Sequence, residues 1–186
     1  MIVKNEASGQ VAVSPIHTFS RALLESLCNT KCPKARFILR AALIVCIPAV
    51  VVAIIGELIG FHSLSSIPSE PWPIVSMHLR LAVTLLDIVV VAPFIETGLC
   101  FLPIIILRRF GLSRTWIAVI SGVAWGAMHL YMGTLVQVAS IWAFFCFTLM
   151  LQVFEVESQD RAWVRVSIVH GLANAFVLLF SVPFWR

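Results

Sequence analysis

Charged residues are scarce in this chain. Only 12% of its 186 residues are Asp, Glu, Lys or Arg, whereas 60% are hydrophobic, and the mean hydropathy is +1.00. Soluble domains carry about 25% charged and roughly 45–50% apolar residues. Several apolar runs of about 20 residues would leave a soluble fold with too little polar surface. The composition therefore excludes a soluble globular enzyme, a disordered chain and a disulfide scaffold, and it predicts a polytopic membrane protein.

Basic charge and cysteine are also limited. The formal net charge is +4, and the 13 Lys and Arg residues lie mainly at the ends of apolar runs. This distribution is typical of membrane topology signals, so we expect no nucleic-acid partner. Cys46, Cys100 and Cys146 lie inside apolar runs and are interpreted as small buried hydrophobes. The pair Cys28 and Cys32 leaves a metal pair or a disulfide open as the less favoured alternative.

Polar segments divide the chain into an N-terminal segment, residues 1–36, and a helical membrane domain, residues 37–186. Residues 19–27 have the spacing of an amphipathic helix that lies at the membrane surface beside basic residues. The predicted fold is an all-α bundle of about five transmembrane helices with this interfacial segment in front. The expected spans are residues 37–60, 75–107, 115–130, 134–153 and 163–184.

One apolar region, residues 75–107, is too long for a single upright span. As a helix it would be roughly 50 Å long, against about 30 Å of hydrocarbon. It is either one long tilted helix kinked at Pro93 or two helices that turn there. One helix returns Arg108 and Arg109 to the cytoplasmic side with the basic N-terminal segment, and leaves the Ser- and Pro-rich loop at 62–73 outside. We therefore favour one helix and five spans over two helices and six spans.

A few ionisable residues lie inside these apolar spans, where they are costly and a functional role is the default hypothesis. Glu57 lies near a span end, could reach the interface and is interpreted as structural. Asp87 lies nine residues before Glu96, about half a turn out of phase on a straight helix. We therefore expect Asp87 to contact another helix.

Four polar side chains could meet inside the bundle: Glu96, His129, His170 and Asn174. His170 and Asn174 are four residues apart and share a helix face. His129 follows Gly122 and Gly126, whose spacing allows close helix approach. With one long helix, all four lie roughly 10–20 Å from the cytoplasmic ends of their spans at about 1.5 Å per residue.

Such a cluster suits hydrolysis of an amide bond within the membrane. A carboxylate can act as general base toward water, while an imidazole and an amide orient the water or stabilise the oxyanion. One carboxylate and two histidines are also a ligand set for zinc or iron, although the spacing lacks an HExxH-type pair. A proton or ion relay through Asp87, Glu96 and the histidines is the non-hydrolytic alternative.

Three short motifs occur in order over residues 75–184. Residues 93–96 are Pro-Phe-Ile-Glu, residues 125–129 place Trp four before His, and residues 170–174 place His four before Asn. They resemble the Pro-x-x-Glu-Glu-x-x-x-Arg, Phe-x-x-x-His and His-x-x-x-Asn or Asp segments of the CPBP family. This is a family of intramembrane proteases that comprises CAAX proteases and bacteriocin-processing proteins and is also called the Abi family.

The resemblance implies a glutamate-dependent endopeptidase of the cytoplasmic (inner) membrane that uses no metal or other cofactor. Its substrate would be a membrane-anchored protein or a C-terminal peptide tail within the lipid bilayer. Glu96 would activate water. His129, His170 and Asn174 would hold that water and stabilise the oxyanion.

Two positions depart from the family pattern, because Thr97 stands at the second glutamate and Phe101 at the arginine. Divergent first motifs are typical of some bacterial branches that act as sorting-signal proteases, which this short chain resembles more than eukaryotic prenyl-protein endopeptidases. The departures leave two alternatives open. One is a catalytically inactive member that acts as a membrane adaptor or immunity protein, and the other is a metal-dependent membrane protease.

Overall fold

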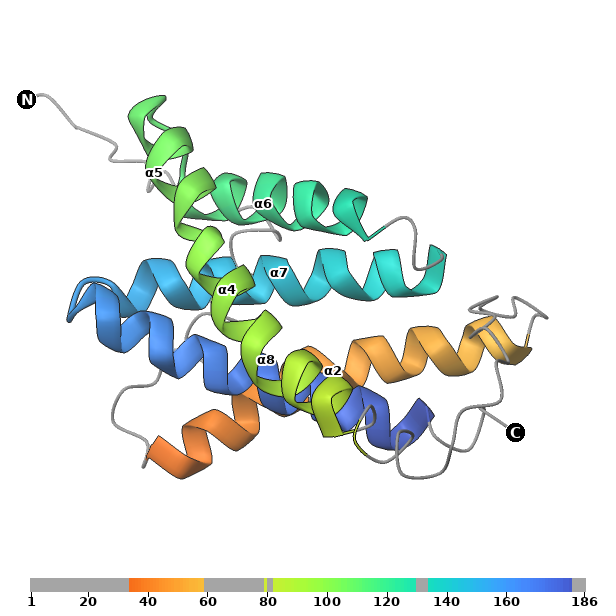
Figure 1. Ribbon diagram of the computed structural model, residues 1–186. Helices are drawn as coiled ribbons and strands as arrows, with labels where there is room; N and C mark the ends of the chain where they lie inside the picture. Colours follow the sequence, from red (N-terminus) through yellow and green to blue (C-terminus); the bar gives the residue numbers. More distant parts are fainter. Residues whose placement is uncertain (1–33, 59–78, 80–81, 130–133, 182–186) are drawn as a thin grey trace, which may run out of the picture.

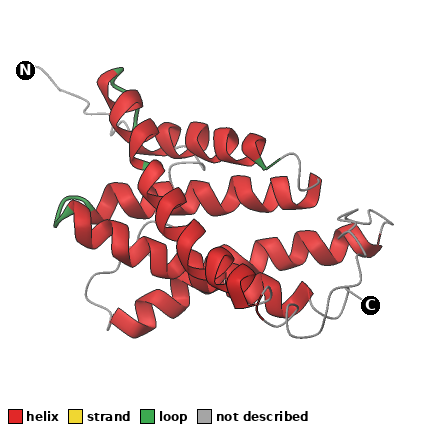
Figure 2. Ribbon diagram, in the orientation of Figure 1, coloured by secondary structure: helices red, strands yellow, loops and turns green. Residues whose placement is uncertain are grey.

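The computed structural model describes residues 34–58, 79, 82–129 and 134–181, and every regular element in these ranges is a helix (Figures 1 and 2). This confirms the predicted all-α class for the described part of the chain. The elements are α2 (Lys34–Leu58), the π-helical turn η1 (Asp87–Val91), α4 (Ala92–Leu99), α5 (Phe101–Arg109), α6 (Arg114–Met128), α7 (Thr134–Phe154) and α8 (Gln159–Ser181).

Three of the described helices are long and apolar enough to cross a membrane: Ala82–Arg109, Val136–Phe154 and Gln159–Leu179. This is fewer than the five spans expected. α6 has 15 residues, which makes about 22 Å of helix against about 30 Å of hydrocarbon. α2 has 25 residues but is not among the three. The interfacial segment at 19–27, the pair Cys28 and Cys32, the loop at 62–73 and the side chain of Glu57 lie outside the described residues.

The long apolar region is one helix over its described part, Ala82–Arg109, and does not turn back at Pro93. The single-helix interpretation is confirmed there. The helix widens to a π turn just before the proline, where the N–H of Ala92 donates to the carbonyl of Asp87, five residues earlier. In this register the carbonyl of Ile88 should pair with the N–H of residue 93, and proline has none. One carbonyl therefore needs a donor from another helix.

A second proline creates the same need in α2. Pro48 lies inside this helix and lacks an N–H, so the carbonyl of Ile44, four residues earlier, has no helical donor. The indole Nε1 of Trp142 on α7 donates to this carbonyl at 3.2 Å. α2 and α7 are thus joined where the hydrogen-bond ladder of α2 is interrupted.

Two glycines of α6 let it approach α7 closely. A Cβ at Gly122 would lie 2.6 Å from the carbonyl oxygen of Ile141, and a Cβ at Gly126 would overlap the Ile141 side chain. Both glycines are buried. The interpretation of this spacing as a close-packing ridge is confirmed, and the partner is α7 of the same chain.

The core is centred on α7, whose residues Phe147, Leu149, Met150 and Leu151 are fully buried. The cysteines at 46, 100 and 146 are also buried and free of disulfides, as expected for small hydrophobes. Because α7 is covered on several sides, residues that project from it can contact α2, α6 and α8 at once.

The basic ends of the helices lie together. Arg108 at the end of α5 pairs with Glu155 after α7, and Phe37 at the start of α2 packs on Phe154 with ring centroids 5.1 Å apart. These ends lie at the left of the view in Figure 1. The Lys and Arg residues of the described helices lie near these ends: Lys34, Arg36 and Arg40 in the first two turns of α2, Arg108 and Arg109 at the end of α5, Arg114 at the start of α6, and Arg161 and Arg165 in the first two turns of α8.

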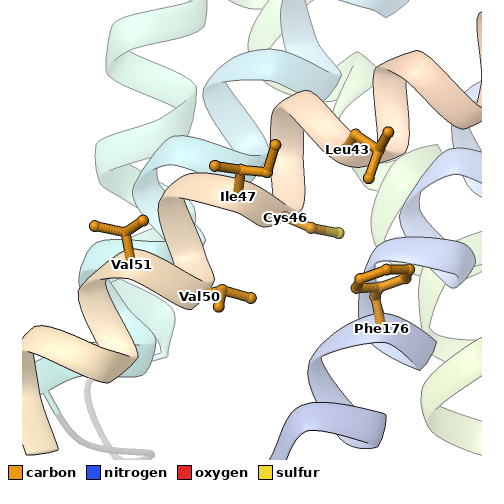
Figure 3. A pocket seen from close by; sticks show the side chains of 6 residues that line it. All are labelled: Leu43, Cys46, Ile47, Val50, Val51 and Phe176. Atoms are coloured by element: carbon orange, nitrogen blue, oxygen red, sulfur yellow. The ribbon is translucent and has the colours of Figure 1, made fainter.

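An apolar groove lies between part of α2 and Phe176 of α8 (Figure 3). Cys46 and Val50 of α2 point toward Phe176 of α8 across it. Its lining consists of Leu43, Cys46, Ile47, Val50, Val51 and Phe176. None of these side chains carries an ionisable carboxylate or an imidazole, so the groove is separate from the polar cluster described below.

We expect Gly122→Ala to destabilise the bundle by about 1–3 kcal/mol, because the new methyl group meets the backbone of Ile141, which cannot move as a side chain can. The free energy of unfolding in mixed micelles measures this effect. Gly98→Ala is the matched control. Its Cβ would lie 3.4 Å from Trp163 Nε1, an ordinary contact, so the better helix propensity of alanine should leave stability equal or higher. Equal losses in both variants would contradict the close-packing account.

Candidate functional site

Two ionisable side chains from different helices meet inside the bundle. The Oε2 atom of Glu96 on α4 lies 3.5 Å from Nε2 of His170 on α8. The His170 side chain is 5% exposed, whereas that of Glu96 is 26% exposed. The carboxylate therefore contacts a buried imidazole and still keeps an open side, which is what a group that must reach a water molecule and a substrate requires.

The opposite ring nitrogen of His170 also has a partner. Nδ1 lies 3.2 Å from Oγ1 of Thr97, which is fully buried. The rings of Phe147 and Phe144 on α7 pack against the imidazole, with centroid distances of 4.4 Å and 5.4 Å. The imidazole is thus fixed at both nitrogens and on its faces and edges by α4 and α7.

His129 lies at the end of α6 and belongs to the same cluster. Its Nδ1 donates to the carbonyl of Trp125 at 2.8 Å, which orients the ring and leaves Nε2 for other contacts. Its ring lies 5.7 Å from that of Phe144, on which Trp125 is stacked at 4.8 Å. Phe144 therefore contacts the rings of both His129 and His170.

Asn174 serves the backbone of the long helix. Its Nδ2 donates to the carbonyl of Ile88 at 2.9 Å, which is the carbonyl that Pro93 leaves without a donor. The amide therefore secures the π turn. The family resemblance implies that Asn174 contacts the oxyanion. In the structure, one N–H of its amide is bonded to the carbonyl of Ile88, which lies eight residues before Glu96 on the long helix.

Gly171 allows α8 to lie directly on the π turn. A Cβ at this position would overlap the carbonyl oxygen of Val89. Farther along the same crossing, the indole Nε1 of Trp163 donates to the carbonyl of Phe94 at 2.8 Å. Since Gly171 stands between His170 and Asn174 in the sequence, the close approach brings both of these side chains to the long helix.

Asp87 begins the π turn and its side chain is exposed. The predicted contact with another helix is not found in the described part of the chain. The π turn lies between Asp87 and Glu96 on the long helix. The wider π turn rotates the chain less per residue than an α-helix, which reduces the phase difference that a straight helix would impose.

Thr97 and Phe101, the two residues that differ from the motif described above, both fit their surroundings. Thr97 takes the buried position beside His170, where its hydroxyl makes a hydrogen bond. Phe101 is 8% exposed and belongs to the apolar core, where an unpaired arginine would be costly. The local packing thus accommodates a neutral pair of side chains at these two positions.

Glu96 and His170 are therefore in contact, Phe144 links the rings of His129 and His170, and Asn174 on α8 donates to the π turn. Three features of the site were not predicted: the contact of Thr97 with His170, the ring contacts of Phe144 with both histidines, and the close helix approach at Gly171. The proline three residues before Glu96 was a usable signal for the π turn, whereas nothing in the sequence of α7 marks Phe144 as a contact of two histidines. Among the residues that the structure describes, no three His, Cys, Asp or Glu side chains are grouped so that they could hold a metal ion.

Comparison of the chain with protein-family models, with curated proteins and with solved structures found no match.

We expect Asn174→Ala to cost about 1–3 kcal/mol of unfolding free energy, because it leaves the part-buried carbonyl of Ile88 without a donor. Pro93→Ala supplies an N–H that can donate to this carbonyl in the π register. The double variant should therefore lose less than the sum of the two single losses, and a double-mutant cycle measures the difference. Strict additivity would show that Asn174 does not compensate for the proline.

Proposed function

We propose that the chain is an intramembrane endopeptidase of the glutamic type, which cleaves a membrane-anchored protein or peptide tail. The observation that carries this proposal is the contact between the carboxylate of Glu96 and the imidazole of His170, made between two apolar helices. Ionisable pairs of this kind are expensive in an apolar environment and are rarely kept without a function. The ordered motifs at 93–96, 125–129 and 170–174 support the same conclusion.

In the proposed reaction, Glu96 accepts a proton from a water molecule as the water oxygen attacks the carbonyl carbon of the scissile peptide. The negative charge that develops on the carbonyl oxygen is stabilised by the second N–H of the Asn174 amide, because the N–H of His170 faces Glu96 and the N–H of His129 is bonded to Trp125. The C–N bond then breaks, and the leaving amine takes the proton from Glu96. The partial exposure of Glu96 supports the role of base, whereas the enclosure of His170 supports the role of a fixed donor.

The proposed topology has five spans in the cytoplasmic membrane. α2 has the length of a span, while α6 is short and packs closely against α7. The arginines of the α5 end and of the start of α8 lie on one side of the bundle with the start of α2. The positive-inside rule assigns this side to the cytoplasm.

The second candidate function is a catalytically inactive member of the same family that binds a membrane partner. Two contacts favour it. Asn174 donates to the backbone of η1, and Nδ1 of His129 donates to its own helix. Both are helix-packing contacts that a protein without catalysis would also need. The experiment below separates the two candidates.

We expect Glu96→Gln to lower proteolysis by at least about 100-fold, since it removes the only general base of the proposed reaction while keeping the size of the side chain. The readout is the set of new peptide ends found in membranes that contain the wild-type protein. Glu157→Gln is the control. Glu157 pairs with Arg165 at the exposed α7–α8 connection, so its replacement should leave proteolysis unchanged.

A crosslinking experiment with the Glu96→Gln protein in native membranes should capture the uncleaved tails and identify the substrate. Full cleavage by the Glu96→Gln protein at normal protein levels would contradict the proposed mechanism. If wild type and Glu96→Gln capture the same partner, and neither cleaves it, the adaptor function is supported instead.

A further inference from the structure

Thr97 and His170 share a buried hydrogen bond, and the atoms around it indicate which of the two groups donates. His170 has two ring nitrogens, and in a neutral imidazole only one of them carries a proton. Nε2 faces Oε2 of Glu96 at 3.5 Å, while Nδ1 faces Oγ1 of Thr97 at 3.2 Å. The partner at each nitrogen therefore decides which tautomer is stable.

As the general base of the proposed reaction, Glu96 is ionised, and an ionised carboxylate only accepts hydrogen bonds. The nitrogen that faces Glu96 must then carry the proton, because two lone pairs facing each other in a buried site would repel. This assigns the proton to Nε2 and leaves Nδ1 as an acceptor. The hydroxyl of Thr97 can donate as well as accept, so it can donate to Nδ1. A carboxyl group at position 97 could donate to Nδ1 only if it were protonated.

Threonine hydroxyls inside helices usually donate to the carbonyl four residues earlier, which here belongs to Pro93. The hydroxyl of Thr97 is instead directed at His170 on another helix. It is fully buried, so no bulk water replaces it as a donor. Its removal would leave Nδ1 of His170 unpaired inside the bundle.

We propose that Thr97 is a positioning residue, whose hydroxyl donates to Nδ1 of His170 and so holds the imidazole as the Nε2–H tautomer that donates to Glu96. This deepens the proposed function and rests on it for its catalytic meaning. The Nε2–H then faces one carboxylate oxygen of Glu96, at 3.5 Å between Nε2 and Oε2. The Glu96 side chain is 26% exposed and so keeps an open side for the water that it is to activate.

The tautomer can be measured without any substrate. We would record ¹⁵N spectra of the full-length protein labelled at histidine, in lipid bilayers, and assign His170 from the signals that disappear in His170→Asn. The expected wild-type pattern is a protonated, pyrrole-type Nε2 and an unprotonated, pyridine-type Nδ1. A pyrrole-type Nδ1 on His170 would overturn the proposal, whatever the protein does to peptides.

Two variants of Thr97 test the hydroxyl itself. Thr97→Val keeps the shape and removes the donor, so the Nδ1 signal of His170 should lose its hydrogen-bond shift and both tautomers should be populated. Thr97→Ser restores a hydroxyl and should restore the wild-type pattern. An unchanged His170 spectrum in Thr97→Val would overturn the proposal.

Thr148 on α7 provides the matched control. It is also fully buried, and its Oγ1 has no hydrogen-bond partner among the described residues. Thr148→Val should leave the His170 spectrum unchanged and leave stability equal or higher. If Thr148→Val altered the His170 signals as much as Thr97→Val does, the effect would be one of general packing and the assignment to Thr97 would be wrong.

Cleavage assays then connect the tautomer to the proposed function. Thr97→Val should lower kcat by about tenfold or more with little change in KM, and Thr97→Ser should recover most of the loss. An altered His170 spectrum combined with unaltered cleavage would overturn the catalytic part of the proposal. Absence of cleavage in the wild type would instead overturn the proposed function and leave the tautomer assignment standing.

Discussion

A backbone carbonyl that loses its donor inside an apolar bundle must find another donor, and this constraint organises the structure. Pro48 frees the carbonyl of Ile44, which accepts from Trp142 on α7. Pro93 frees the carbonyl of Ile88, which accepts from Asn174 on α8. In both cases a side chain from a neighbouring helix completes the ladder, so each proline also determines which helix lies beside it.

The second of these contacts determines the geometry of the candidate site. Since Asn174 is bonded to the π turn, His170 one helical turn earlier on α8 is held beside the next turn of the long helix. Gly171 makes the approach possible because it has no Cβ to meet the carbonyl of Val89. Glu96 and Thr97 are adjacent in the sequence, and together they hold the two nitrogens of one imidazole.

Much of the helix pattern could be predicted from apolar run lengths, because helices in an apolar setting must satisfy their own backbone. The meeting of Glu96 with His170 also followed from counting residues along the spans. The π turn could not be predicted in this way, because a helical periodicity assumes a constant rotation per residue. The contact of Asp87 with another helix, which this periodicity predicted, is not found among the described residues, where Asp87 is exposed. The role of Phe144 was equally hidden, since it arises only when α6, α7 and α8 pack together.

The contact between the carboxylate of Glu96 and the imidazole of His170 is the central claim, and its most direct test is a distance. Dipolar ¹³C–¹⁵N recoupling between Glu96 Cδ and His170 Nε2, in labelled protein reconstituted into lipid bilayers, measures it without reference to any substrate. The structure predicts a detectable coupling, because Oε2 and Nε2 are 3.5 Å apart. A coupling too weak to detect, in protein whose α8 still packs on the π turn, would contradict the account.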